Sequence, residues 1–336
     1  MFDPTKLNYH ALDIKVSPRD FTPEQIASAK IVGTSKYIRR IVAPLMVLML
    51  LLWTGGISVA HTPGGATLSS ILAGLFEMAL VVGVILFFVL SALWREHQQE
   101  LRLLKFSLDN NLGYQSSGAA IPADPMMFNM GSDRKVKFSL TAPGDFSFAN
   151  YDYTIGSGKN QQTIEVTFAK VKLPRAVPQL YLNARSNWIN ADAMSYKVQK
   201  LKLEGDFDQF FETYAPPEYQ IDALQLLTPD VMQALKEVAA AYDFELVGDY
   251  LYAYAAPQTI KSAKLLETFL AAVQQVAAQF SHQAKVYTSD HVVSVNGVSQ
   301  IAPVARFARK RMTVYVVIIL LITFLVFFAL PLILGT

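Results

Sequence analysis

Four carboxylates lie close together in the sequence, and paired carboxylates can act as general acid and base or hold a divalent cation. No histidine lies near them, and Phe207 and Phe210 alternate with the acids. This pattern is typical of a helix or strand start whose aromatic side chains are buried and whose acids are solvated. We therefore interpret the group as structural, with a cation or acid–base site as the alternative. Its members are Glu204, Asp206, Asp208 and Glu212.

The tetrapeptide GSGK, residues 156–159, looks like part of a phosphate-binding loop. Such a loop needs a glycine five residues before the Gly-Lys pair and a hydroxyl residue after the lysine, but these positions hold Tyr153 and Asn160. The flanking stretches "FSFANYDYT" and "TIEVTFAKVKL" are typical of strands. We therefore predict a hairpin turn, in which glycine supplies positive φ angles.

Glu77 is an acid inside a long apolar run. In a bilayer an ionised carboxylate would cost a few kcal/mol unless it is paired, protonated or hydrated. The apolar runs contain no lysine or arginine partner, whereas Thr54 and Ser58 offer hydroxyl groups at a similar depth. We interpret Glu77 as a protonated acid bonded to such local groups. A proton or ion contact, or a hydrogen bond to another subunit, is the functional alternative.

Other catalytic signals are missing from the sequence. Cysteine is absent, which excludes disulfides, thiolate zinc sites and cysteine nucleophiles. The five histidines form no pair at metal-ligand spacing, and we find no nucleophile elbow or dinucleotide fingerprint. We therefore predict no catalytic residue, no metal site and no cofactor. The histidines are His10, His61, His97, His282 and His291.

The chain contains three long apolar runs. The chain of 336 residues is 52% hydrophobic and 17% charged, with a mean hydropathy of +0.28, which is too apolar for an ordinary soluble protein. Each run is long enough to cross the ~30 Å hydrocarbon layer as a helix. The polar residues before the first run carry several acids, so we predict a retained anchor and not a signal peptide. The predicted transmembrane helices are Ile41–Ala60, Leu68–Trp94 and Met312–Leu334.

Lysine and arginine residues flank the predicted spans on one side, whereas "HTPGGAT" between the first two spans contains neither. Short loops rich in these residues stay cytoplasmic, so we predict a multi-pass protein of the bacterial cytoplasmic (inner) membrane. Its N-terminus and main domain would face the cytoplasm, and its C-terminus would lie outside. We also predict contacts with anionic lipid headgroups and no nucleic-acid partner. The predicted headgroup contacts are Arg39, Arg40, Arg95, Arg309, Lys310 and Arg311.

The region between the second and third spans predicts an α+β domain, an antiparallel sheet with helices packed on it. Stretches rich in β-branched and aromatic residues favour strands up to about Glu204, and later segments show helical spacing. The predicted divisions are a cytoplasmic N-terminal segment (1–40), a two-helix transmembrane hairpin (41–94), a helix stub and linker (95–134), the cytoplasmic α+β domain (135–300) and a C-terminal transmembrane helix (312–334).

Three local signals refine this domain. Thr228 is a candidate helix cap, and Pro229 suits the first helical position. The stretch "FELVGDYLYAYAA" is predicted to form two strands with a turn at Gly248-Asp249. A longer helix carries an apolar stripe, whose members are Leu266, Phe269, Leu270, Val273, Ala277 and Phe280.

Three stretches of the domain resemble a family of uncharacterised bacterial multi-pass membrane proteins. They are "YDYTIGSGKNQQT", "VKLPRAVPQLYLNARSN" and "LEGDFDQFFETYAPPEYQIDALQLLTPDVMQAL". The last is the most specific, because it combines several short motifs in a fixed order. The resemblance implies a recurrent membrane-tethered α+β module, and it supplies no activity or catalytic residues.

These observations favour a protein without catalytic activity. We expect an integral membrane protein that presents its domain to a protein partner as a scaffold, an assembly factor or an envelope sensor. Membrane lipids and a protein partner, or further copies of the chain, are the expected contacts. Two alternatives stay open: a membrane-bound enzyme acting on lipid or envelope precursors at the acidic group, and a homo-oligomeric transport-associated subunit organised around Glu77.

Overall fold

The computed structural model describes residues 3–29, 68–122, 124–187, 199–203, 205–288, 292–295 and 298–301. The chain divides into two compact units, and it passes between them several times. Both units are therefore built from segments that are far apart in the sequence. Unit 1 comprises Met1–Ala120, Lys135–Tyr151 and Pro257–Ala271, and unit 2 comprises Ile121–Arg134, Asp152–Ala256 and Ala272–Thr336.

The main sheet has seven strands in the order β1-β2-β3-β4-β6-β5, and β7 pairs with β4. The strand pairs β1–β2, β4–β6, β4–β7 and β5–β6 are antiparallel. The predicted antiparallel sheet of an α+β fold is therefore confirmed. The strands are β1 (Gly113–Gln115), β2 (Ser132–Ala142), β3 (Phe146–Ile155), β4 (Gln162–Ala184), β5 (Gln199–Leu201), β6 (Phe211–Ala215) and β7 (Asp243–Ala255), and a separate pair is formed by β8 (Val292–Val295) and β9 (Val298–Ile301).

The described helices differ greatly in length. The α-helices are α1 (Pro23–Ser28), α3 (Leu68–Asp109), α4 (Gln220–Leu226), α5 (Pro229–Val238) and α6 (Ala263–Val286). Short 3-10 helices are η1 (Pro4–Lys6), η2 (His10–Leu12), η3 (Pro18–Asp20), η4 (Met127–Asn129), η5 (Gly158–Asn160), η7 (Phe207–Gln209), η8 (Pro217–Tyr219) and η9 (Pro257–Lys261). In the part of the chain that the structure describes, none of the helices combines the length and the apolarity needed to cross a bilayer.

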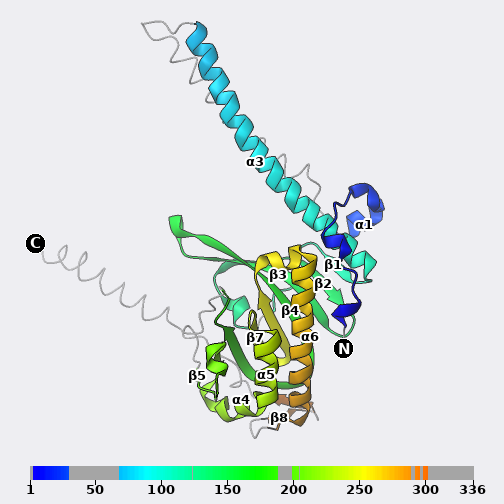
Figure 1. The fold of residues 1–336 in the computed structure, drawn as a ribbon, viewed down its shortest axis with the longest axis vertical. Coiled ribbons are helices and arrows are strands. Elements are labelled where there is room, and N and C mark those ends of the chain that lie inside the picture. Colours follow the sequence, from blue (N-terminus) through cyan, green and yellow to red (C-terminus); the bar gives the residue numbers. More distant parts are fainter. Residues whose placement is uncertain are drawn as a thin grey trace, which may run out of the picture. The chain divides into compact units, whose positions relative to one another are not determined.

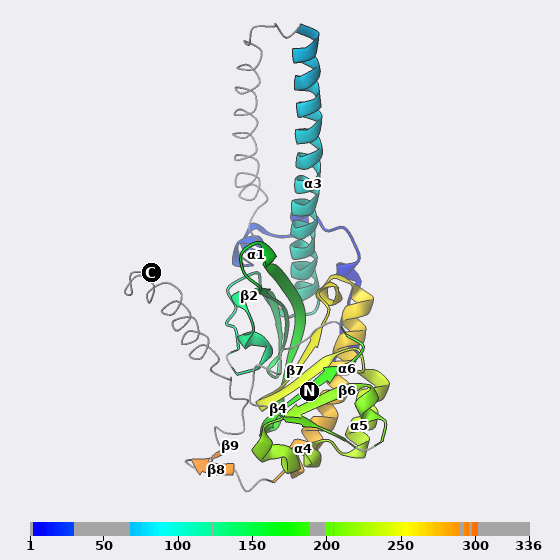
Figure 2. The same ribbon diagram turned by 90° about the vertical axis from the view of Figure 1, so that its left-hand side faces the viewer.

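In unit 1, the N-terminal segment packs on the last turns of α3 (Figures 1 and 2). Val16 and Phe21 form a buried cluster with Leu101 and Leu104 of the helix. Polar contacts fix the same pairing, because the Asn8 N–H donates to the Asn110 side chain at 2.6 Å, and the Asn110 amide donates back to the Asn8 carbonyl at 3.0 Å. These residues are about a hundred positions apart in the sequence, so the contact closes a long loop.

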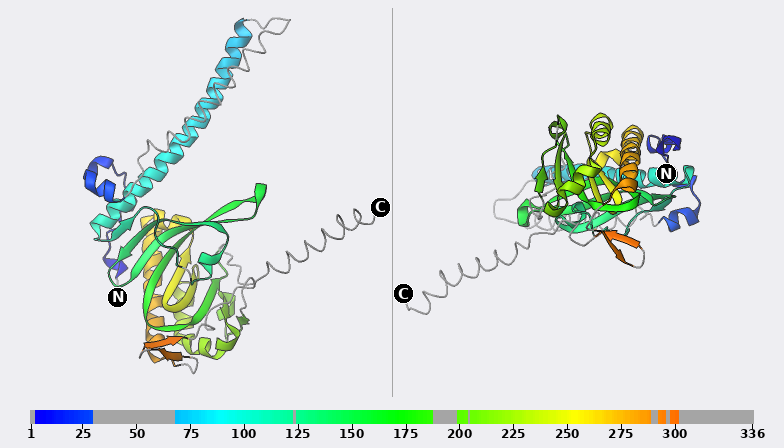
Figure 3. Two further views of the ribbon diagram at one scale, coloured as in Figure 1. Left: turned by 180° about the vertical axis from the view of Figure 1, so that it is seen from behind. Right: turned by 90° about the horizontal axis from the view of Figure 1, so that it is seen from below.

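In unit 2, the strands carry helices on one side. Figure 3 (right) shows α4, α5 and the orange end of α6 on one side of the strands, and the β8–β9 pair on the other. The predicted apolar stripe of α6 is confirmed, because all of its members are fully buried. Thr228 holds the N-cap position of α5, but its side chain does not cap the helix. Its hydroxyl accepts from Gln283 Nε2 at 3.3 Å instead.

One of the two turns predicted from the sequence is absent and the other is present. The predicted pair of strands around Gly248 is wrong, because β7 is one continuous strand in which Gly248 takes a positive φ of 59°. The ladder shifts register beside it, at Val177 of β4. The GSGK tetrapeptide joins β3 to β4, which are neighbours in the sheet, and Gly156 and Gly158 have φ of 80° and 58°. The predicted hairpin is therefore confirmed.

Candidate functional site

The structure separates the predicted acidic group. Asp206 forms an ion pair with Lys236, whose Nζ lies 2.6 Å from the Asp206 Oδ1 atom, and this bond lowers the pKa of Asp206. The Asp208 side chain instead accepts from the Leu203 backbone N–H at 3.4 Å. Glu204 lies outside the described residues. Asp206 and Asp208 therefore face different partners.

Glu212 of β6 has partners on β5, directly after β4 and on its own strand. Its Oε1 atom is 2.6 Å from Lys200 Nζ and 3.0 Å from the Arg185 guanidinium group, and its Oε2 atom accepts from the Tyr214 hydroxyl at 2.8 Å. The bonds from Lys200 and Tyr214 lower the pKa of Glu212. Among the described residues, no His, Cys, Asp and Glu side chains gather in a group of three that could hold a metal ion. The geometry favours the structural interpretation of this group.

Replacing Glu212 by glutamine tests that interpretation. We expect the free energy of unfolding to fall by less than about 1 kcal/mol, because exposed ion pairs contribute little. Since the pKa of Glu212 is lowered, its contribution is present at neutral pH and is lost as the pH falls through the folded-state pKa. Urea unfolding of the full chain in mild detergent would measure the change, with Glu237→Gln on α5 as the control. A loss of several kcal/mol, or a loss of Mg²⁺ binding, would contradict the structural interpretation.

Two carboxylates that the sequence analysis did not single out are buried in β7. Asp243 and Glu245 alternate with Phe244, so they project from the same face of the strand, and all three are fully buried. Tyr181 of β4 lies directly opposite Glu245 in the ladder. Acids enclosed in this way need hydrogen-bond partners, because burying a polar group without them costs free energy.

Asp243 accepts three hydrogen bonds. Its Oδ1 atom accepts from the Ala184 backbone N–H at 2.7 Å and from the Asn187 amide at 2.6 Å. Its Oδ2 atom accepts from the Tyr181 hydroxyl at 2.9 Å. All of these donors belong to β4 or to the turn that follows it, so the carboxyl group fixes the end of β4 against the start of β7.

Glu245 accepts hydrogen bonds from different parts of the chain. Its Oε1 atom accepts from the Met126 backbone N–H at 2.7 Å and from the Gln179 amide at 2.5 Å. Its Oε2 atom accepts from the Tyr254 hydroxyl at 2.9 Å. Met126 lies 119 positions earlier in the sequence, so this carboxyl group joins the segment before η4 to the sheet.

Both acids titrate near neutral pH. Burial raises the pKa of Asp243 to about 7 and the pKa of Glu245 to about 7, and the hydrogen bonds offset only part of this effect. Burial also raises the pKa of Tyr181 and of Tyr254 well above its ordinary value, so both hydroxyls stay protonated and donate. Because the two carboxyl groups are fully enclosed and already accept bonds on both oxygens, we interpret them as a structural network and not as a catalytic pair.

Part of α3 carries an exposed apolar surface. None of the residues from Gly83 to Trp94 is buried, and Phe87 and Phe88 are 68% and 63% exposed. Further along the same helix, Leu101 and Phe106 have no exposed surface. The helix therefore changes its surroundings between Trp94 and Leu101, from a stretch without a buried residue to a packed core. We call residues 83–94 the apolar belt.

The other predicted site residues belong to α3 or lie outside the described residues. Glu77 is part of α3, but its side chain is not among those described. Arg95 is exposed and follows Trp94 directly, and Lys15 Nζ lies 5.6 Å from the centre of the Trp94 ring. The other predicted headgroup contacts lie outside the described residues: Arg39, Arg40, Arg309, Lys310 and Arg311.

Comparisons with known proteins add little to this geometry. No protein-family model matches the chain, and no curated protein matches it. A solved structure, the crystal structure of the mycobacterial trehalose monomycolate transport factor A, TtfA, aligns with 52% of this chain and 89% of that chain. The sequence identity is 10% and the TM-score is 0.36. A similarity this weak assigns neither a fold nor a function.

Proposed function

We propose that this chain is an integral protein of the bacterial cytoplasmic membrane that presents its α+β domain to a protein partner at the cytoplasmic side. It would act there as a scaffold, an assembly factor or an envelope sensor. Three transmembrane helices, Ile41–Ala60, Leu68–Trp94 and Met312–Leu334, would hold it in the membrane. The domain would follow the second helix and precede the third, so the bilayer would tether it at both ends.

The apolar belt carries this proposal. A surface helix of a soluble protein buries one apolar face and exposes a polar one, whereas the belt is apolar apart from Ser91 and none of its residues is buried. Its length is about 18 Å at 1.5 Å per residue, and the apolar sequence continues before it to Leu68. Trp94 ends the belt and Arg95 follows it, and tryptophan and arginine are typical of the membrane–water interface on the cytoplasmic side. The hydrocarbon layer of a membrane would accommodate such a surface.

A protein partner is supported by a small apolar patch on α4. Ile221 and Leu224 are three positions apart, so they share a helix face, and they are 75% and 52% exposed. The opposite face of the same helix is buried through Ala223 and Leu226. Large apolar side chains side by side on a surface are typical of protein interaction sites.

The alternatives receive less support. An enzyme acting at the acidic group would need carboxylates that are available to a substrate or a cation, whereas Asp206 and Glu212 form ion pairs with lysine or arginine. Asp243 and Glu245, whose pKa values burial raises to about 7, are enclosed.

Site-specific crosslinking in native membranes tests the proposal. A photoreactive amino acid at Ile221 is expected to give one reproducible, stoichiometric adduct with another protein, because this side chain belongs to the exposed patch. The control position is Gln233, which is exposed on α5 outside the patch. Adducts of the protein with itself alone, or equal adducts from both positions, would contradict a partner at α4. Release of the wild-type chain from membranes by alkaline carbonate would contradict the membrane assignment.

A further inference from the structure

A cavity of 230 Å³ lies in unit 1, beside the turn of α3 that follows the apolar belt. Its walls come from α3, from η2 near the N-terminus and from η9. The volume is several times the ~30 Å³ that one water molecule occupies in the liquid, so the cavity has room for a small polar group. Trp94 and Leu12 supply apolar surface at its edge.

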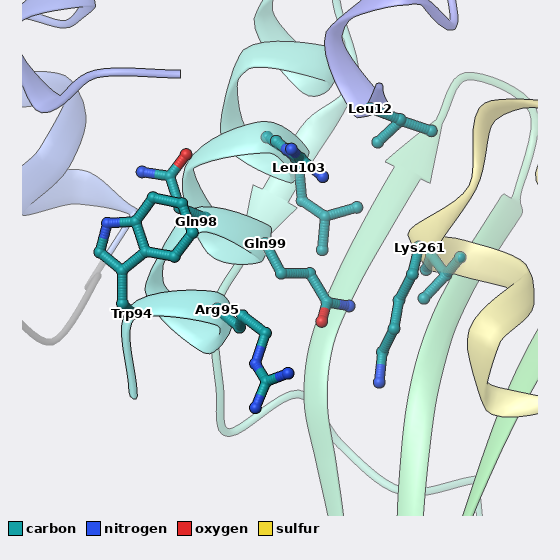
Figure 4. A pocket seen from close by; sticks show the side chains of 9 residues that line it. Leu12, Trp94, Arg95, Gln98, Gln99, Leu103 and Lys261 are labelled. Carbon is teal, nitrogen blue, oxygen red and sulfur yellow. The ribbon is translucent and has the colours of Figure 1, made fainter. Parts of the chain in front are cut away.

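The charged lining of this cavity has one sign. Arg95, Arg102 and Lys261 line it, and no aspartate or glutamate does. Arg95 and Arg102 have no ion-pair partner in the described part of the chain. Figure 4 shows the side chains of Arg95, Gln99 and Lys261 pointing into the same space. Cations that converge in this way create a positive potential, which attracts an anion.

The hydrogen-bonding groups of the lining point to the same kind of ligand. Arg102 Nε and Gln99 Nε2 are buried, and neither has a hydrogen-bond partner among the described residues. Both atoms are donors, so a ligand that satisfies them must offer acceptor oxygens. Leaving buried donors unsatisfied costs free energy. A phosphate group offers several charged acceptor oxygens and suits arginine geometry well.

The position of the cavity identifies the source of the phosphate. Arg95, Gln99 and Arg102 follow one another at helical spacing and share one face of α3, and this face begins directly after Trp94, where the apolar belt ends. We infer that the cavity binds the phosphate of an anionic phospholipid, whose acyl chains lie along the belt. This inference rests on the proposed membrane location of α3. It adds Arg102, Lys261 and Gln99 to the predicted contacts and makes the contact a defined site.

Titration of the purified full chain in mild detergent tests the site. The probes are short-chain phosphatidylglycerol, short-chain phosphatidylcholine and glycerol 3-phosphate, and binding is followed by the protection of the fold against heat. We expect phosphatidylglycerol to bind best, and Arg102→Gln and Lys261→Gln each to weaken it by about tenfold or more, because each removes a charge-assisted contact. Lys264→Gln, an exposed lysine outside the cavity, is the matched control and should bind like the wild type.

The outcomes separate the lipid site from the proposed function. Equal binding of phosphatidylglycerol by the wild type and by both cavity variants overturns the inference. Equal binding of glycerol 3-phosphate overturns the lipid source and assigns the cavity to a soluble phosphate compound. Lys261 is exposed, so Lys261→Gln keeps the test valid even if Arg102→Gln fails to fold. None of these results depends on a protein partner, which the crosslinking experiment tests by itself.

Discussion

Replacement of Glu245 by alanine is expected to lower the free energy of unfolding by about 3–5 kcal/mol, because it leaves buried donors unsatisfied and removes a fully buried side chain. The change leaves the Met126 N–H, the Gln179 amide and the Tyr254 hydroxyl without their acceptor. It also opens a cavity in a fully buried position. Urea unfolding of the full chain in mild detergent, followed by circular dichroism, would measure the loss.

Glu245→Gln is the matched control for this prediction. The glutamine oxygen can still accept from Met126 and Gln179, and its amide can donate to the Tyr254 hydroxyl, which rotates to accept. We expect this variant to lose much less stability than the alanine variant. Equal stability of the wild type and Glu245→Ala would contradict the structural role that we assign to the network.

The stability of the wild type and that of Glu245→Gln should also depend differently on pH. Burial raises the pKa of Glu245 to about 7, so between roughly pH 4 and pH 7 the folded state holds more protons than the unfolded state. The contribution of this carboxyl group to stability is therefore greatest in acid, falls as the pH rises through this window and is constant above it. The free energy of unfolding of Glu245→Gln, subtracted from that of the wild type at each pH, gives the contribution of this carboxyl group. Plotted against pH, this difference should have a negative slope between pH 5 and pH 7.

The second large effect is expected from charges in the apolar belt. Val84 and Phe87 are 47% and 68% exposed and lie on one face of α3. In water, arginine at both positions would change little. Within a membrane, each arginine near the middle of a span costs about 2.5–3.5 kcal/mol on insertion scales. We therefore expect Val84→Arg with Phe87→Arg to prevent insertion of the second span, which would leave the domain on the outer side.

A single cysteine reports this change, because the chain contains no other. Ser157→Cys, at the exposed turn between β3 and β4, should resist a membrane-impermeant maleimide in intact cells. It should be labelled when both arginines are present, and Val84→Leu with Phe87→Leu is the control. Unchanged protection in the double arginine variant would contradict the assignment of the belt to the membrane.

Periodicity predicted the parts of the fold that depend on local patterns. The stripe from Leu266 to Phe280 follows helical spacing and is buried as expected. The strand after GSGK was also predicted, over a stretch that ends at Leu173, and prolines follow at Pro174 and Pro178. The structure continues β4 through both prolines, with register shifts that accommodate them. Tertiary pairing with β7 extends the strand beyond its local signal.

The candidate sites were harder to predict, because their partners come from distant parts of the chain. Asp206 and Glu212 are close in sequence, but Lys236 and Arg185 hold them separately. The two acids of β7 alternate with apolar residues, which is typical of a strand with one solvated face. Their burial depends on Tyr181 and on the segment around Met126. The sequence shows the alternation of acidic and apolar residues in β7, but it does not show which distant groups donate hydrogen bonds to the two acids.

The continuity of α3 has a mechanical consequence under the proposed topology. The helix runs without proline from Leu68 to Asp109, about 63 Å at 1.5 Å per residue, and sharp kinks in helices need proline or a comparable defect. The belt and the packed turns at Leu101 and Phe106 therefore move as one rod. A change in bilayer thickness that tilts the belt would swing the end that holds Asn8 and Val16, so the helix would act as a lever that reports the state of the membrane to unit 1.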